Sequence, residues 1–287
     1  MLSRFHRSNW PPYSHHFWTS FCSLLALPSM RCLGMTSCRR VPTSFIRHAL
    51  SSYEQVALCD IQLDSRHVDC AFPSQRKAQS TTSLHRLVFE YMAGREDEML
   101  RDVLLSPDFD LRRIRSLGFA VHARGSLVGF CQIALRCNSI VHLELEFVNR
   151  IEREEPIELP HLLGLRFLTL RQSIKALRLR RDMISVLETV HERTPNLEVV
   201  NVVIHAREPW GPSSYPQTHR VDSALRNLPR LRRIHFRIYP SSEVMAVSRD
   251  MRQKLPGANA ASLLVFTSPA WRNERRMEPF SNHLDLV

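Results

Sequence analysis

The sequence predicts an α/β protein built as an irregular solenoid, with parallel strands on a concave face and helices on a convex face. Two observations lead to this prediction. A six-residue pattern (apolar, two residues, apolar, one residue, apolar) recurs along most of the 287-residue chain. Apolar residues at helical spacing occupy the stretches between its copies. One strand and one helix per period is the unit of a leucine-rich repeat.

The copies of the pattern follow one another at near-regular steps. Six clear copies begin at Leu84, Ile114, Ile140, Leu165, Leu197 and Leu231, two weaker ones begin at Met30 and Tyr53, and a last one lies at 263–266. The competing fold is an ordinary α/β domain, which has the same alternation of elements. Such a domain does not need the same signature in each strand, so the repetition favours a repeat array whose neighbours stack to bury a continuous core.

Each predicted element follows from this alignment. We expect parallel strands near residues 87–89, 117–119, 143–145, 168–170, 200–202 and 234–236. We expect helices over 96–105, 127–135, 183–190, 221–228 and 241–255. Ser241 or Ser242 is a candidate N-cap of the last helix, and Pro256-Gly257 is its predicted stop.

The repeat-like array is predicted to cover residues 27–268, with an atypical or disordered segment at 1–26 and a C-terminal tail at 269–287. No acidic residue precedes Glu54, and this arginine- and serine-rich stretch has the composition of a mitochondrial presequence. Pro11 and Pro12 interrupt an amphipathic helix there. We therefore expect a cytoplasmic or nuclear protein, with mitochondrial targeting as the alternative.

Composition excludes several classes of protein. The formal net charge is +11, but the basic residues are nearly all arginine, since Lys77, Lys175 and Lys254 are the only lysines. We do not expect nucleic-acid binding from charge alone. Seven cysteines without a Cys-x-x-Cys motif do not indicate a disulfide framework. No stretch of 18 apolar residues predicts a membrane span.

Catalytic and metal-binding motifs were sought without success. The sequence contains no glycine-rich phosphate loop, no Gly-x-Ser-x-Gly elbow and no His-Glu-x-x-His motif. Cys131 and Cys137 lie on a predicted helix without a second pair of ligands, so they are predicted to be buried thiols. The sequence therefore predicts a protein that is not an enzyme and has no cofactor or metal.

The residues between the apolar positions of each strand are predicted to face the concave surface, because side chains alternate along a strand. The polar ones are the candidate partner-binding residues. They are Arg86, Glu90, His142, Glu144, Glu146, Thr169, Arg171, Asn201, Arg233, His235 and Arg237.

The charges on this face separate along the array. Glu144 and Glu146 form an acidic cluster, and three strands further on Arg233, His235 and Arg237 form a basic one. Strands lie about 4.8 Å apart, so we expect the clusters to be about 14–15 Å apart. Our hypothesis is that Arg171, together with the two arginines of the basic cluster, holds an acidic segment of a protein partner. The alternative is a solvated edge without a ligand.

Several segments carry a resemblance to a known family. They are Val-Pro-Thr-Ser-Phe-Ile at 41–46, the stretch 159–170 that begins Leu-Pro-His, Thr-Pro-Asn-Leu at 194–197 and Leu-Pro-Arg-Leu at 228–231. These resemble the irregular leucine-rich repeats of F-box proteins from mushroom-forming fungi. In that family an F-box docks on the Skp adaptor of a cullin ubiquitin ligase and the repeats present a substrate. This chain has no Leu-Pro-x-Glu entry to an F-box helix.

We therefore predict a non-enzymatic, protein-binding leucine-rich-repeat domain. One alternative, implied by the resemblance, is a substrate-recognition subunit of an SCF-type ubiquitin ligase with a lost or truncated F-box. Another is a mitochondrial or nucleic-acid-associated basic protein. The expected partner is a protein on the concave face, and also the Skp adaptor if an F-box exists.

Overall fold

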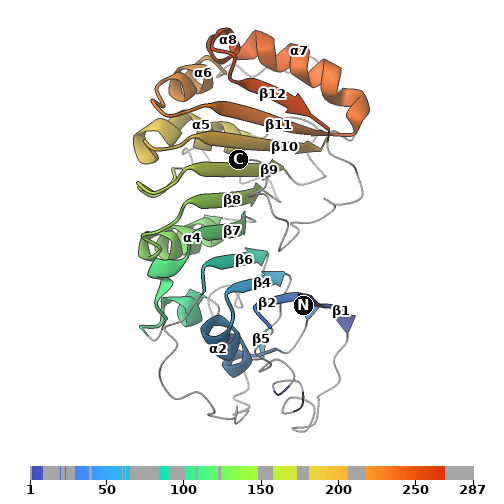
Figure 1. Ribbon diagram of the computed structural model, residues 1–287, viewed down its shortest axis with the longest axis vertical. Coiled ribbons are helices and arrows are strands. Elements are labelled where there is room, and N and C mark those ends of the chain that lie inside the picture. Colours follow the sequence, from blue (N-terminus) through green and yellow to red (C-terminus); the bar gives the residue numbers. More distant parts are fainter. Residues whose placement is uncertain are drawn as a thin grey trace. The chain divides into compact units, whose positions relative to one another are not determined.

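A computed structural model of the chain shows a mixed α/β fold with parallel strands (Figure 1). It describes residues 2–8, 20, 23, 30–38, 41–59, 61, 63–64, 84–90, 101–107, 109–121, 124–147, 158–172, 181–205 and 218–268. The described residues fall into two compact units. The first unit runs to Leu117 and includes 136–139, and the second comprises 118–135 and 140–268. Strand β7 (Ser116–Val121) contributes residues to both units.

The second unit contains strands in the same order in space as in the sequence. They are β8 (His142–Phe147), β9 (Phe167–Gln172), β10 (Val199–His205), β11 (Arg233–Tyr239) and β12 (Leu264–Thr267). Each strand pairs in parallel with the next. The predicted strands of this unit and their parallel pairing are confirmed.

The apolar positions of the repeated pattern form the core of the second unit. Leu143, Leu168, Val200 and Ile234 lie opposite one another across β8 to β11, and each is at most 1% exposed. Burying a side chain of this size contributes about 1.5–3 kcal/mol. The six-residue pattern therefore fixes the register as well as the place of each strand, because a slip by one residue would bring polar side chains into this row.

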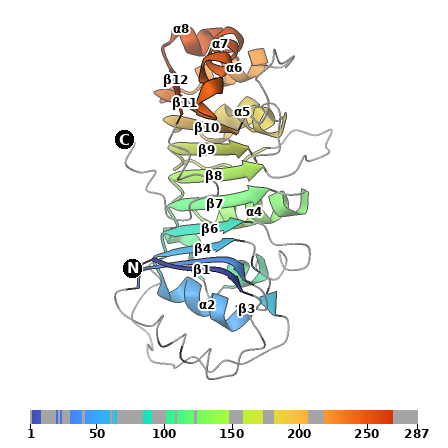
Figure 2. The ribbon, with the colours of Figure 1, turned by 90° about the vertical axis from the view of Figure 1, so that its right-hand side faces the viewer.

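The predicted helices of the second unit are present. They are α4 (Arg124–Arg136), α5 (Arg181–Arg193), α6 (Thr218–Arg226), the 3₁₀ turn η2 (Ser241–Glu243) and α7 (Val244–Lys254). Figure 2 shows α5 and α6 on the same side of the strands. Their apolar stripes, which include Met183, Val190, Val221 and Leu225, are buried. The strands thus have one face covered by helices and an opposite face that carries the candidate residues.

The end of the last predicted helix differs from the prediction. Neither Ser241 nor Ser242 is an N-cap, since η2 begins after Pro240 and α7 after Glu243 without a side-chain cap. Helix α7 ends at Lys254, as expected, but Pro256 opens a further short helix, α8 (Pro256–Ala260). A proline fits the first turn of a helix because it lacks the N–H that would be unpaired there.

The first unit is also built on parallel strands. They are β1 (Leu2–Ser8), β2 (Cys32–Cys38), β4 (Gln55–Cys59) and β6 (Arg86–Glu90), and each pairs in parallel with the next. Strands β3 (Val41–Pro42) and β5 (Leu63–Asp64) form a separate pair, and helix α2 (Thr43–Ser52) follows β3. The weak copies at Met30 and Tyr53 correspond to β2 and β4. No copy of the pattern predicted β1, which lies in the segment 1–26.

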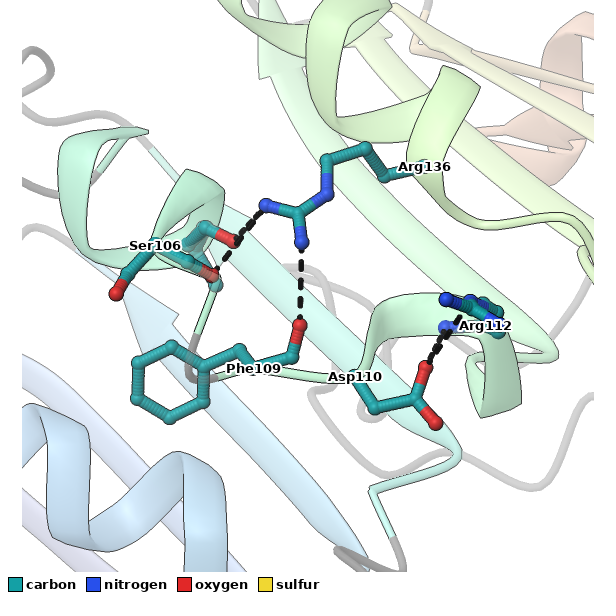
Figure 3. Close-up of polar contacts among 6 residues, drawn as sticks. Ser106, Phe109, Asp110, Arg112 and Arg136 are labelled. Atoms are coloured by element: carbon teal, nitrogen blue, oxygen red, sulfur yellow. Dashed lines mark hydrogen bonds and ion pairs between the residues drawn. The ribbon is translucent and has the colours of Figure 1, made fainter.

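Arg136 joins several backbone segments of the first unit. Residues 101–105 are helical, in agreement with the predicted helix, whose residues 96–100 lie outside the described part. The Arg136 guanidinium donates hydrogen bonds to the carbonyl oxygens of Leu104 and Ser106 at 3.4 Å and of Phe109 at 3.3 Å (Figure 3). An arginine at this position satisfies carbonyls that the end of a helix leaves unpaired. Next to it, Asp110 accepts from the backbone N–H of Arg112 and caps the 3₁₀ turn η1 (Leu111–Arg113).

The second residue of each copy makes the same backbone contact. Its carbonyl oxygen accepts two hydrogen bonds, from consecutive N–H groups at the start of the next strand. In the first unit these carbonyls belong to Arg31, Glu54 and His85, and in the second to Val141, Arg166 and Glu198. The donors of one such pair, Arg232 and Arg233, lie 2.8 and 3.3 Å from the oxygen of Glu198. The copies are therefore equivalent in structure as well as in sequence.

Candidate functional site

The outward-facing residues of the second unit form three rows across the strands. Pairing in register places His142, Phe167, Val199 and Arg233 in the first row, Glu144, Thr169, Asn201, His235 and Val265 in the second, and Glu146, Arg171, Val203, Arg237 and Thr267 in the third. We call these residues together the strand face. Every candidate residue predicted for β8 to β11 lies on it.

Much of the strand face is buried, which corrects the prediction that all of its residues are exposed. Glu144 and Thr169 are each 4% exposed, Arg171 is 3% exposed and His235 is 8% exposed. Val203 of the third row is fully buried. The prediction considered only the alternation of side chains along one strand. Long side chains on adjacent strands also reach and cover one another.

Glu144 and Arg171 form a buried ion pair. The Nε and Nη2 atoms of Arg171 donate to the same carboxylate oxygen of Glu144, at 3.1 and 2.9 Å. Both side chains are almost inaccessible to solvent, at 6% and 4%. The expected separation of acidic and basic clusters is therefore wrong at this position, because Arg171 is bound to an acidic residue of the neighbouring strand. Its charge is already compensated within the fold.

Hydrogen bonds connect other residues of the first and second rows. The Thr169 hydroxyl lies 3.3 Å from Nε2 of His142 and accepts from the Asn201 amide at 3.4 Å. His235 contacts the hydroxyl of Thr267 at 2.7 Å. Thr267 was not predicted as a site residue, because β12 matched the pattern only weakly. These contacts indicate that the second row stabilises the pairing of strands.

The first row is the more open part of the strand face. His142, Phe167 and Val199 are partly exposed and Arg233 is exposed. In the other rows, Glu146, Asn201 and Arg237 are partly exposed. Solvent, and hence a partner, has its widest access at the start of the strands. This part of the face combines one aromatic ring, one aliphatic side chain and basic groups.

The residues that lead into β9, β10 and β11 extend this open part, and sequence reasoning missed them. Arg166 donates two hydrogen bonds to the Glu198 carboxylate, from Nε at 2.7 Å and from Nη2 at 2.9 Å. These bonds lower the pKa of Glu198, and the charges of Arg232 and Arg230 lower it further. The same carboxylate raises the pKa of Arg166. The second position of each copy, at which Arg166, Glu198 and Arg232 stand, was the signal that could have found them.

Two candidate residues lie in the first unit. Arg86 is partly exposed at the start of β6, where its N–H binds the carbonyl of Glu54. Glu90 ends β6 opposite Cys59, and its side chain lies outside the described part of the structure. We describe these two residues separately from the strand face because they belong to the other unit.

Comparison with known proteins assigns no family to the chain. No protein-family model matches it, and a search of curated proteins finds no significant match. The chemistry of the strand face is therefore argued from its own residues.

Titratable and metal-binding groups were considered throughout the described ranges. Within them, no three His, Cys, Asp or Glu side chains gather closely enough to hold a metal ion. Burial raises the pKa of the Cys137 thiol to about 12, so this group is protonated at neutral pH. Cys137 is buried as predicted, whereas Cys131 is only partly buried. Among the helices described, none is long and apolar enough to cross a membrane.

Proposed function

We propose that the chain is an irregular leucine-rich-repeat solenoid that is not an enzyme and binds another protein through its strand face. The observation that supports this most directly is the recurring backbone contact at the second residue of each copy. A contact that repeats with the sequence pattern is typical of stacked structural repeats, in which each unit contacts its neighbours. An ordinary α/β domain has no need of it.

The order of the strands supports the same proposal. In the second unit β8 to β12 follow one another in space as in the sequence, all in parallel, and α5 and α6 cover one side. Helices on one side leave the opposite side of the strands accessible where no other segment covers it. Repeat proteins use such a surface for binding because it gathers side chains from many repeats.

The composition of the open row fits a protein partner. Phe167, Val199 and Arg233 come from three successive strands and are at least partly exposed. Aromatic residues and arginine are enriched in protein interfaces, where they provide much of the binding energy. The resemblance of the repeats to those of F-box proteins, which present substrates, agrees with a binding role.

Site-specific photo-crosslinking tests this function. A photoreactive residue at position 199 of the strand face is compared with one at position 249, where Arg249 is exposed on α7. After irradiation in the cells that produce the chain, we expect a distinct protein adduct from position 199 only. Equal adducts from both positions, or none from either, would contradict the proposal. Co-purification of the Skp adaptor would indicate a ubiquitin-ligase subunit.

A further inference from the structure

Exposed arginines gather where the chain enters β9 to β11. We use the name arginine edge for Arg166, Phe167, Glu198, Val199, Arg230, Arg232 and Arg233. We infer that the arginine edge binds an extended acidic segment of a protein partner, with an apolar side chain of that segment packed on Phe167 and Val199. This inference rests on the proposed protein-binding function and specifies the place and the chemistry of the partner.

Strand pairing arranges the edge in two adjacent lines. Because Phe167, Val199 and Arg233 lie opposite one another, the residues before them, Arg166, Glu198 and Arg232, follow the same order. Adjacent strands are about 4.8 Å apart, so the strand positions of Arg166 and Arg232 are about 10 Å apart. A short extended segment laid across the strands would reach both.

The charges of the edge do not cancel. Glu198 is its only acidic residue, and both of its oxygens accept from Arg166. Arg230, Arg232 and Arg233 are exposed, and none of the three has an ion-pair partner within 4 Å among the described residues. Three guanidinium groups are therefore available to carboxylates of a partner, and arginine binds carboxylates in a paired, directional geometry.

An apolar seat lies beside these charges. The guanidinium of Arg166 lies 5.6 Å from the centre of the Phe167 ring, which it partly covers. Phe167 and Val199 are directly opposite each other and both are partly exposed. The Glu198 bonds hold Arg166 in place, so this aromatic surface is ordered before a partner arrives. Little conformational entropy would then be lost when an apolar side chain packs there.

The edge fits an acidic protein segment better than a nucleic acid. Nucleic-acid affinity depends on many phosphate contacts along a continuous basic surface. Here the Glu198 carboxylate stands between Arg166 and Arg232, one strand spacing from each, and would repel a phosphate backbone that crossed the strands. A polypeptide can place its carboxylates on the arginines and a neutral residue over this position.

The inference also differs from our hypothesis based on sequence. That hypothesis placed the acidic segment on Arg171, Arg233 and Arg237. Arg171 is buried and bound to Glu144, so a partner cannot reach it without breaking that pair. The exposed guanidinium groups lie at the entry to the strands instead.

Fluorescence anisotropy with a labelled twelve-residue peptide of glutamates around one central leucine tests the inference. The test variant is Arg232→Glu/Arg233→Glu. The matched control is Arg220→Glu/Arg249→Glu, which replaces exposed arginines on α6 and α7. Each variant lowers the formal net charge by four, from +11 to +7. We expect the test variant to weaken peptide binding at least about tenfold at low salt and the control to change it less than about twofold.

Further arms identify what the edge recognises. Replacing the central leucine of the peptide with serine should weaken binding to the unmodified chain, and Phe167→Ser should remove that difference. Equal losses in both double variants, or no binding of the peptide by the unmodified chain, would overturn the inference. A random DNA duplex that binds more tightly than the peptide and is lost in the test variant would also overturn it. Melting curves should confirm that all variants are folded.

Failure of this inference can be told apart from failure of the proposed function. If the protein captured from position 199 binds the Arg232→Glu/Arg233→Glu variant as well as it binds the unmodified chain, the strand face is a binding surface but the arginine edge is not its acidic-segment site. If no protein is captured, the binding function itself fails.

Discussion

Replacing Leu168 with alanine tests whether the repeated pattern forms one stacked core. Leu168 is fully buried in β9, and its neighbours in register, Leu143 and Val200, are also 0% exposed. The substitution removes three carbon atoms from the centre of this row. The neighbours are fixed by parallel backbone pairing on both sides, so they have little freedom to move into the space.

The expected loss of stability follows from this geometry. Leucine-to-alanine changes in protein cores cost about 2–5 kcal/mol, and the larger costs occur where the surroundings cannot collapse into the cavity. We expect a loss of about 3–4 kcal/mol for Leu168→Ala. For a unit of this size such a loss lowers the melting temperature by about 10 °C.

Urea denaturation followed by circular dichroism measures this change, and the chain offers a control of the same chemistry. Leu163 precedes β9 and is 64% exposed, so Leu163→Ala should change the free energy of unfolding by less than about 0.5 kcal/mol. If the two variants were equally stable, Leu168 would not belong to the core and the alignment of copies would be wrong.

Three further predictions concern polar and backbone features. Arg171→Met should destabilise the fold by about 3–5 kcal/mol because it leaves the Glu144 carboxylate buried and unpaired, and adding Glu144→Leu should recover most of that loss in the same urea assay. Arg166→Met should raise the pKa of Glu198, measured by NMR titration. Because this pKa is lowered in the folded state, the stability that the pair contributes is present at neutral pH and is lost as the pH falls through the pKa of Glu198. Unfolding curves at neutral and acidic pH should therefore differ between Arg166→Met and the parent chain at neutral pH and converge in acid. Ser262→Gly should stabilise the fold by about 1 kcal/mol, because Ser262 follows α8 with a φ of 56°, a conformation that glycine adopts without strain; a midpoint in urea that falls on this substitution would contradict that reasoning.

The positions of the strands could be predicted from the sequence because one short pattern determines them. The apolar residues of each copy must all face the same core, so aligning the copies also aligns the strands. Leu143, Leu168, Val200 and Ile234 occupy the same place in their copies and are opposite one another in the structure. By contrast, β1 lies in a segment without a copy and could not be found in this way.

The burial of the strand face could not be predicted from the pattern. Alternation along a strand says which side a residue faces but not what lies above it. Glu144 is opposite Thr169 in register, yet its carboxylate binds Arg171, two residues further along β9. Such a diagonal contact depends on the length of the arginine side chain and on the twist of the strands, and neither is visible in a one-dimensional alignment.

The second position of each copy separates the stability of the fold from the chemistry of its surface. Its backbone carbonyl makes the contact with the next copy, and this bond does not depend on the side chain. Arginine, glutamate, histidine and valine all occur at this position, at Arg31, Glu54, His85 and Val141 among others, with the same pair of hydrogen bonds. Selection can therefore change charge along this line without disturbing the core. A reversal of charge at exposed Arg232 should alter what the edge binds while leaving the melting temperature nearly unchanged, and that separation is what a binding surface built from repeats requires.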